Sequence, residues 1–256
     1  ARAEVFAEVA HLDPALAAHE PVVAVRALMA RLADTDDLAT ALRLVAAPAV
    51  FTPAVVRAQA GKAPVAPDPA LGHAADILRM LHGTPATKEA VAGLDTYLVT
   101  VSDHGLNAST FAARVVASTR AGLTSAALAG LGALKGPLHG GAPGPVIEML
   151  DEIGAPENAR AWIEAALARK ERLMGFGHRI YRVRDPRADA LKGPVRALAA
   201  AKGGGRVAFA EAVEQAALDI LKAHKPDRPL DTNVEFYTAL LLEALAFPPS
   251  AFTCVF

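Results

Sequence analysis

Alanine occupies 59 of the 256 positions, nearly a quarter of the chain. It has the strongest helix propensity of the amino acids, and its small side chain lets helices pack closely. Runs of β-branched and aromatic residues bounded by turns, which are typical of strands, are scarce in this sequence. The composition therefore predicts an all-α fold.

Apolar residues recur at helical spacing along much of the chain, so each such segment can turn one apolar stripe toward a core. The segments with this spacing are 25–32, 38–45, 91–101, one from about 109, 145–153, one from about 156 to 167, 209–221 and 233–245. The proline-rich stretch 61–69 is expected to be a loop, because proline removes backbone donors and disfavours helix before it. Three consecutive glycines, 203–205, predict a surface connection between helices.

Charge and composition exclude several classes of protein. The 26 basic and 27 acidic residues nearly cancel, so no electropositive field favours nucleic acid. No uncharged run approaches the roughly 20 residues that a membrane-spanning helix needs, and the first residues lack a secretory signal pattern. No Cys/His cluster has zinc spacing, and no dinucleotide-binding glycine motif follows a strand, so neither a metal nor a nicotinamide cofactor is expected. The single cysteine, Cys254, suits a reducing cytoplasm, where we expect this protein.

Three of the eight histidines stand in irregular segments that contain glycine: His104, His139 and His178. Glycine beside a polar side chain permits close approach of the backbone to a ligand. His139 precedes a predicted helix whose positive end would disfavour the imidazolium ion. A neutral ring can donate a hydrogen bond to a developing enolate. Each histidine, taken singly, also fits a structural role, and His139 could simply cap the helix.

Arginines are concentrated just after His178, at positions 179, 182, 184 and 187. Guanidinium groups bind carboxylates and phosphates through paired donors, which suits a ligand with several negative groups. The alternatives are a solvated surface or ion pairs with Asp185 or Asp189.

Glu235 lies in the first turn of a predicted helix that Asn233 would cap. The positive end of that helix favours the ionised carboxylate that a general base requires. Acidic residues in first turns also merely stabilise helices, so this position alone decides nothing.

Three longer motifs, taken together, resemble the citrate synthase family in order and spacing. They are Asp-His-Gly-Leu-Asn-Ala-Ser-Thr-Phe at 103–111, Lys-Gly-Pro-Leu-His-Gly-Gly-Ala at 135–142, and Met-Gly-Phe-Gly-His-Arg at 174–179 followed by Asp-Pro-Arg at 185–187. The resemblance is clear from about residue 38 to residue 256.

This resemblance implies a helical homodimer with the active site between two domains. A large helical domain would comprise 1–141 and 246–256, and a small helical domain 142–245. The implied reaction condenses acetyl-CoA, with coenzyme A as the carrier, and oxaloacetate to citrate, with hydrolysis of the thioester. Two alternatives stay open: a 2-methylcitrate synthase that uses propionyl-CoA, and a noncatalytic paralogue.

The resemblance also implies residue roles. His139 would donate to the thioester carbonyl, Glu235 would remove a methyl proton, and His178 would polarise the oxaloacetate ketone. The residues that would bind oxaloacetate are His104, Asn107 and Arg187. The coenzyme A site would comprise Leu173, Met174, Gly175, Phe176, Gly177 and Arg182.

The sequence departs from the family pattern at several positions. Glu235 replaces the usual aspartate, and its extra methylene moves the carboxylate by more than about one ångström, so we expect weakened activity. Leu-Asp-Thr-Asn at 230–233 replaces a typical Leu-Tyr-Pro-Asn, and Ala239 replaces a glycine. Two substrate-binding arginines that follow in the family have no counterpart up to residue 256. A chain complete at 256 residues would bind oxaloacetate poorly, because the carboxylates of the substrate would lack partners. We expect instead that the sequence is part of a longer polypeptide, since the apolar run 251–256 stops without a helix-ending residue.

Overall fold

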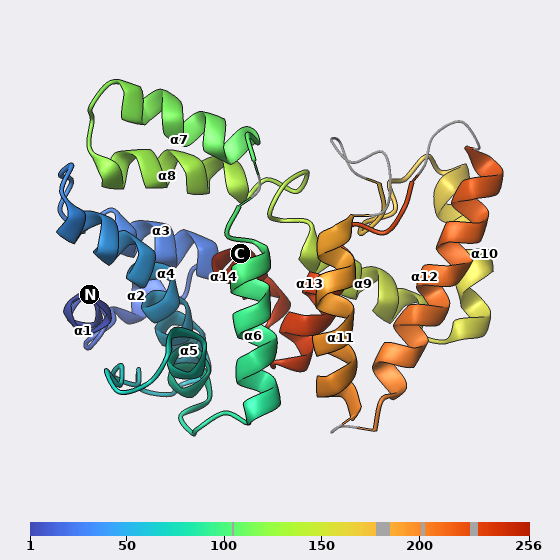
Figure 1. Ribbon diagram of the computed structural model, residues 1–256, viewed down its shortest axis with the longest axis horizontal. Coiled ribbons are helices and arrows are strands. Elements are labelled where there is room, and N and C mark those ends of the chain that lie inside the picture. Colours follow the sequence, from blue (N-terminus) through green and yellow to red (C-terminus); the bar gives the residue numbers. More distant parts are fainter. Residues whose placement is uncertain (104, 178–184, 201–202, 226–229) are drawn as a thin grey trace. The chain divides into compact units, whose positions relative to one another are not determined.

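The computed structural model describes residues 1–103, 105–177, 185–200, 203–225 and 230–256 (Figure 1). The described residues form helices joined by turns and loops, and they contain no strand. One isolated antiparallel bridge pairs Phe176 with Thr232. The predicted all-α fold is confirmed.

The helices follow one another along the chain. Their bounds are α1 Arg2–Phe6, α2 Pro14–Ala17, α3 Pro21–Met29, α4 Leu38–Gln59, α5 His73–His82, α6 Lys88–Thr100, α7 Ala108–Ser118, α8 Leu123–Leu134, α9 Pro143–Ile153, η1 Pro156–Asn158, α10 Ala159–Ala168, α11 Pro186–Ala200, α12 Gly205–His224, α13 Val234–Ala244, η2 Pro249–Ala251 and α14 Phe252–Val255. The loop predicted at 61–69 is present between α4 and α5.

The longest helix, α4, continues through two prolines, Pro48 and Pro53. Each proline removes one backbone hydrogen bond, yet the central turns are buried, with Ala47, Phe51 and Val55 fully inside. By length and hydropathy alone α4 could cross a membrane, a test that buried core helices also pass, and 56% of its most apolar window is buried within the protein. This helix is therefore weak evidence for a membrane span.

The chain falls into two compact units. Unit 1 comprises Ala1–Val91, Ser102–Gly141 and Ser250–Phe256, and unit 2 comprises Ala92–Val101 and Ala142–Pro249. The division falls within α6. The large and small domains expected from the sequence stay a prediction.

In unit 1, α4 is the central helix and contacts α1, α3, α5, α8 and α14. A hairpin of α7 and α8 forms a separate layer, in which the two helices run side by side (Figure 1). Small residues permit their close approach: a Cβ added at Gly130 would lie 3.3 Å from the Cβ of Ala113.

In unit 2, α13 is the central helix and contacts α9 and α11, while α12 contacts α10 and α11. Eight of the eleven residues of α13 are buried. Phe236 and Tyr237 are both fully enclosed, and their rings lie 5.5 Å apart. Because α13 is packed on several sides, the position of its first turn is set by its neighbours, and that turn carries Glu235.

Candidate functional site

His139 lies in unit 1, in a tight turn that follows α8. The backbone amides of His139 and Gly141 both donate to the carbonyl of Gly136, over 2.9 and 3.1 Å. A Cβ at Gly141 would lie 2.8 Å from the carbonyl oxygen of Lys135, which is closer than such atoms approach. Glycine at 141 therefore lets the chain fold back against the end of α8.

The ring of His139 is held by a short hydrogen-bonded series. Its Nε2 lies 2.9 Å from Oγ of Ser109. Ser109 in turn lies 2.8 Å from Oδ1 of Asn107, which also accepts from the amide of Thr110 and so caps α7. The edge of Phe256 packs against the ring, with centroids 6.4 Å apart. These contacts orient the imidazole without a charged partner.

Burial lowers the pKa of His139, so the ring is neutral near pH 7. A neutral ring was expected from the field of the following helix, whereas its cause in the structure is desolvation. Ser109 has no role in the sequence analysis. Its place in the 103–111 motif, two residues after a capping asparagine, is the signal that could have singled it out.

Glu235 lies in unit 2, in the first turn of α13. Asn233 caps this helix as predicted, and its Oδ1 accepts from the amide of Glu235 over 3.0 Å. Burial raises the pKa of Glu235 to about 7; the charges of Arg187 and Arg172 oppose this rise, and that of Asp185 adds to it. Desolvation thus outweighs the helix field that the sequence argument considered. The result is a carboxyl group poised to gain or lose a proton near neutral pH.

Tyr97 of α6 also belongs to this environment. Its side chain is fully buried, and its pKa is raised well above the usual value by burial and by the charge of Glu235. The phenol therefore stays protonated beside the carboxylate.

Arg187 forms a two-point ion pair with Asp185. Its Nε and Nη2 donate to the two carboxylate oxygens over 3.0 and 2.9 Å, and Asp185 is only 1% exposed. Asp185 also accepts from the backbone amide of Val234 over 3.1 Å, which ties the pair to the first turn of α13. Burial would raise the pKa of Asp185, but the hydrogen bond and charge of Arg187 lower it overall. The pairing with Asp185 that the sequence left open is therefore present, and the role of Arg187 in binding substrate stays a prediction.

The predicted coenzyme A segment, 173–177, runs beside residues 231–233. Gly177 donates from its amide to the carbonyl of Asp231 over 2.7 Å, and Asn233 donates to the carbonyl of Gly175 over 2.9 Å. The side-chain amide of Asn233 donates to the carbonyl of Gly177 over 2.8 Å. Gly175 and Gly177 both have positive φ, of 85° and 77°, which favours glycine. Leu173 and Phe176 are buried, and residues 231–233 already bond the amide of Gly177 and the carbonyls of Gly175 and Gly177.

Unit 2 thus brings together Glu235, Arg187 and the segment that includes Met174, while unit 1 brings together His139 and Asn107. His104, His178 and Arg182 lie outside the described residues. Among the residues that the structure does describe, no group of three or more His, Cys, Asp or Glu side chains could hold a metal ion.

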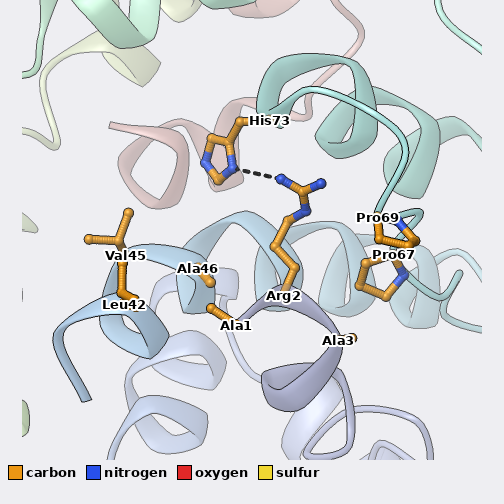
Figure 2. Close-up of a pocket in the computed structure, with 9 residues that line it drawn as sticks. All are labelled: Ala1, Arg2, Ala3, Leu42, Val45, Ala46, Pro67, Pro69 and His73. Atoms are coloured by element: carbon orange, nitrogen blue, oxygen red, sulfur yellow. Dashed lines mark hydrogen bonds between the residues drawn. The ribbon is translucent and has the colours of Figure 1, made fainter. Parts of the chain in front are cut away.

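A pocket of about 380 Å³ opens elsewhere in unit 1, near the start of the chain (Figure 2). Figure 2 shows Arg2 directed toward His73, with 3.5 Å between Nη1 and Nδ1. Arg2 also pairs with the buried Asp76 and donates to the carbonyl of Leu71, so its guanidinium is engaged by the protein. The residues that line the pocket are Ala1, Arg2, Ala3, Leu42, Val45, Ala46, Pro67, Pro69 and His73. They include none of the predicted site residues.

Comparison with known proteins gives consistent matches. The family model described as "Citrate synthase, C-terminal domain" matches residues 2–256. The chain is 38% identical over 219 residues to a citrate synthase of Deinococcus radiodurans, and 36% identical over 231 residues to a 2-methylcitrate synthase of Mycobacterium tuberculosis. These alignments cover 85% and 87% of this chain, but only 57% and 56% of the two relatives.

A solved structure agrees with the sequence matches. The citrate synthase of Thermoplasma acidophilum, in a ternary complex with carboxymethyl coenzyme A and oxaloacetate, has a TM-score of 0.83 to this chain at 29% identity. The match covers 98% of this chain and 68% of the archaeal one. Because the family model spans nearly every residue, this chain belongs to the citrate synthase family.

Proposed function

We propose that the protein condenses acetyl-CoA with oxaloacetate and hydrolyses the resulting thioester to release citrate and coenzyme A. The observation that carries this proposal is the environment of Glu235. Its carboxyl group has a pKa of about 7 and lies in the first turn of a capped helix, beside the segment 173–177. A general base works best when its pKa lies near the working pH.

In the proposed reaction, the Glu235 carboxylate takes a proton from the acetyl methyl group and the thioester becomes an enolate. His139 donates a hydrogen bond to the thioester oxygen, where negative charge develops. Ser109 has one hydroxyl proton, which it donates to Oδ1 of Asn107 in the structure, so Nε2 of His139 is the donor to Ser109 there. The proposed reaction therefore requires Ser109 to turn its proton from Asn107 to Nε2, after which the neutral ring carries its own proton on Nδ1. That proton is then available to the substrate.

The enolate carbon next attacks the ketone carbon of oxaloacetate and forms the new carbon–carbon bond, while the thioester carbonyl re-forms. In this proposal His178 polarises the ketone and supplies the proton that its oxygen needs to become the citryl hydroxyl. Water then cleaves the citryl thioester, so that coenzyme A leaves as the free thiol. In this proposal the segment 173–177 lies along the coenzyme A thioester arm. His104, Asn107 and Arg187 bind the oxaloacetate carboxylates.

We also propose that the protein is a homodimer. The outer face of the α7–α8 hairpin supports this, because Phe111 and Val115 of α7 are 63% and 49% exposed. Exposed apolar side chains on one helix face are typical of a protein interface. A cytoplasmic location is a further proposal, supported by a lone cysteine, Cys254, whose pKa burial raises to about 12.

Propionyl-CoA is a second candidate substrate, favoured by the match to a 2-methylcitrate synthase. One methylene discriminates acyl chains by only about 1–3 kcal/mol, so both substrates need testing. Purified protein, expressed from the whole reading frame, is mixed with oxaloacetate and either acyl-CoA while free thiol is measured. Release with acetyl-CoA at the higher kcat/KM supports the first proposal, and a preference for propionyl-CoA supports the second. No release from either would refute both and leave a noncatalytic paralogue.

A further inference from the structure

Unit 2 contains a buried carboxylate that the proposed reaction does not use. Glu214, on α12, is 4% exposed. Its Oε1 accepts a hydrogen bond from Oγ1 of Thr232 over 2.7 Å, and its Oε2 accepts from the hydroxyl of Tyr237 over 2.6 Å. Lys192 of α11 lies 3.4 Å from Oε2 and supplies a positive charge. A buried carboxylate is costly unless it is paired and hydrogen-bonded, and here both oxygens have partners.

The two hydroxyl donors lie on either side of Glu235 in the sequence. Thr232 is the residue before the cap Asn233, and Tyr237 follows Glu235 by two positions. Thr232 is fully buried and forms the isolated bridge with Phe176. Glu214 therefore fastens the chain at two points, one before the first turn of α13 and one within it.

Thr232 also stands at a departure from the family pattern, where a proline is typical. Proline fixes its own φ and has no side-chain donor, whereas threonine leaves the backbone freer and gains a hydroxyl. In this chain the hydroxyl is bonded to Glu214, so a hydrogen bond replaces the stiffness of the ring. The same stretch precedes the longer Glu235, whose carboxylate must still reach the substrate.

We propose that Glu214 is a positioning residue, which acts through Thr232 and Tyr237 to place the carboxylate of Glu235. This inference rests on the proposed function of Glu235 as the base. Removing either hydroxyl frees one end of the first turn of α13, and a displacement of about one ångström at a reacting group can cost up to about a hundredfold in rate.

The test uses Thr232→Val and Tyr237→Phe, each of which removes one hydroxyl while keeping the shape of the side chain, and Glu214→Gln. The matched control is Glu211→Gln, because Glu211 lies one turn earlier on α12 and pairs with Arg196 and with the same Lys192, rather than with the two hydroxyls. For the variants we expect kcat to fall about tenfold with KM changed less than about threefold, as positioning predicts. The double variant Thr232→Val/Glu214→Gln should lose no more than the worse single one. The control should keep the parent kcat.

A second readout does not depend on turnover. The pKa of Glu235, followed by carbon-13 NMR of its carboxyl group, should move by at least about half a unit in Tyr237→Phe and stay unchanged in Glu211→Gln. If unfolding shows a loss of stability while kcat and this pKa match those of the parent, Glu214 is merely structural and the inference is overturned. A parent protein that releases no thiol refutes the proposed function instead, and the NMR titration then still decides whether Glu214 positions the carboxylate.

Discussion

Glu235→Gln should make the protein more stable above pH 7 while it abolishes turnover. Folding raises the pKa of this carboxyl from 4.5 to about 7, because burial penalises the charged form more than Arg187 and Arg172 favour it. Between pH 4.5 and about 7, the folded state therefore keeps a proton that the unfolded state has already released. The stabilising contribution of the proton is fully present below pH 4.5 and is lost as the pH rises through about 7.

The magnitude follows from the size of this shift. Each pKa unit corresponds to about 1.4 kcal/mol. The raised pKa therefore lowers the unfolding free energy by about 3 kcal/mol above pH 7 and by about 1 kcal/mol at pH 5, relative to acid conditions where the carboxyl is neutral in both states. Glutamine has a similar shape and no charge to desolvate, so the unfolding free energy of the variant is not lowered in this way. The gain in unfolding free energy should therefore grow by roughly 2 kcal/mol between pH 5 and pH 8.

The assay is urea unfolding of parent and variant at pH 5, 6, 7 and 8, with matched ionic strength. Glu148→Gln is the control, because Glu148 lies exposed on α9 of the same unit; it removes a surface charge and should change the unfolding free energy by no more than about 0.5 kcal/mol. A Glu235→Gln difference that is the same at pH 5 and pH 8 would refute the reasoning, since it would mean that the carboxyl is not held in its neutral form.

Three further predictions concern the proposed chemistry, and all use thiol release or proton exchange as the measurement. Ser109→Ala removes the hydrogen bond to His139, and kcat should fall about tenfold while helix content by circular dichroism stays the same; an unchanged kcat would separate Ser109 from the reaction. Glu235→Asp keeps a carboxylate and should retain or raise turnover, so a loss as large as that of Glu235→Gln would contradict the base role. His139→Ala should abolish exchange of the acetyl methyl protons with solvent in a folded protein, and exchange at the parent rate would reject its assignment.

The helical class and the caps could be predicted because they depend on local chemistry. Alanine content and apolar spacing indicated the helices, and Asn233 was correctly placed as the cap of α13. The extent of α4 could not be predicted in the same way. Periodicity was traced only over 38–45, whereas the helix passes Pro48 and Pro53. Tertiary contacts around the buried turns outweigh the two missing backbone hydrogen bonds, and these contacts leave no local signal.

The electrostatics of the candidate site depend on long-range packing in the same way. The contact of His139 with Ser109 joins residues 30 positions apart, and the network of Glu214 joins α12 to residues 18 and 23 positions away. The direction of the pKa shift of Glu235 needed its burial, since the helix terminus alone would lower it. Residue types and motif spacing therefore identified the candidate site residues, whereas their protonation states depend on burial, which only the folded structure shows.

Asn233 has a consequence for how ligand binding and chemistry are connected. Its one side-chain amide accepts from the backbone of Glu235 and donates to the carbonyl of Gly177. A molecule that pushed Gly177 outward would pull on the same amide that closes the start of α13. Binding of coenzyme A at 173–177 would thus shift the carboxylate of Glu235 through the side-chain amide of Asn233 alone, without any rearrangement of the core.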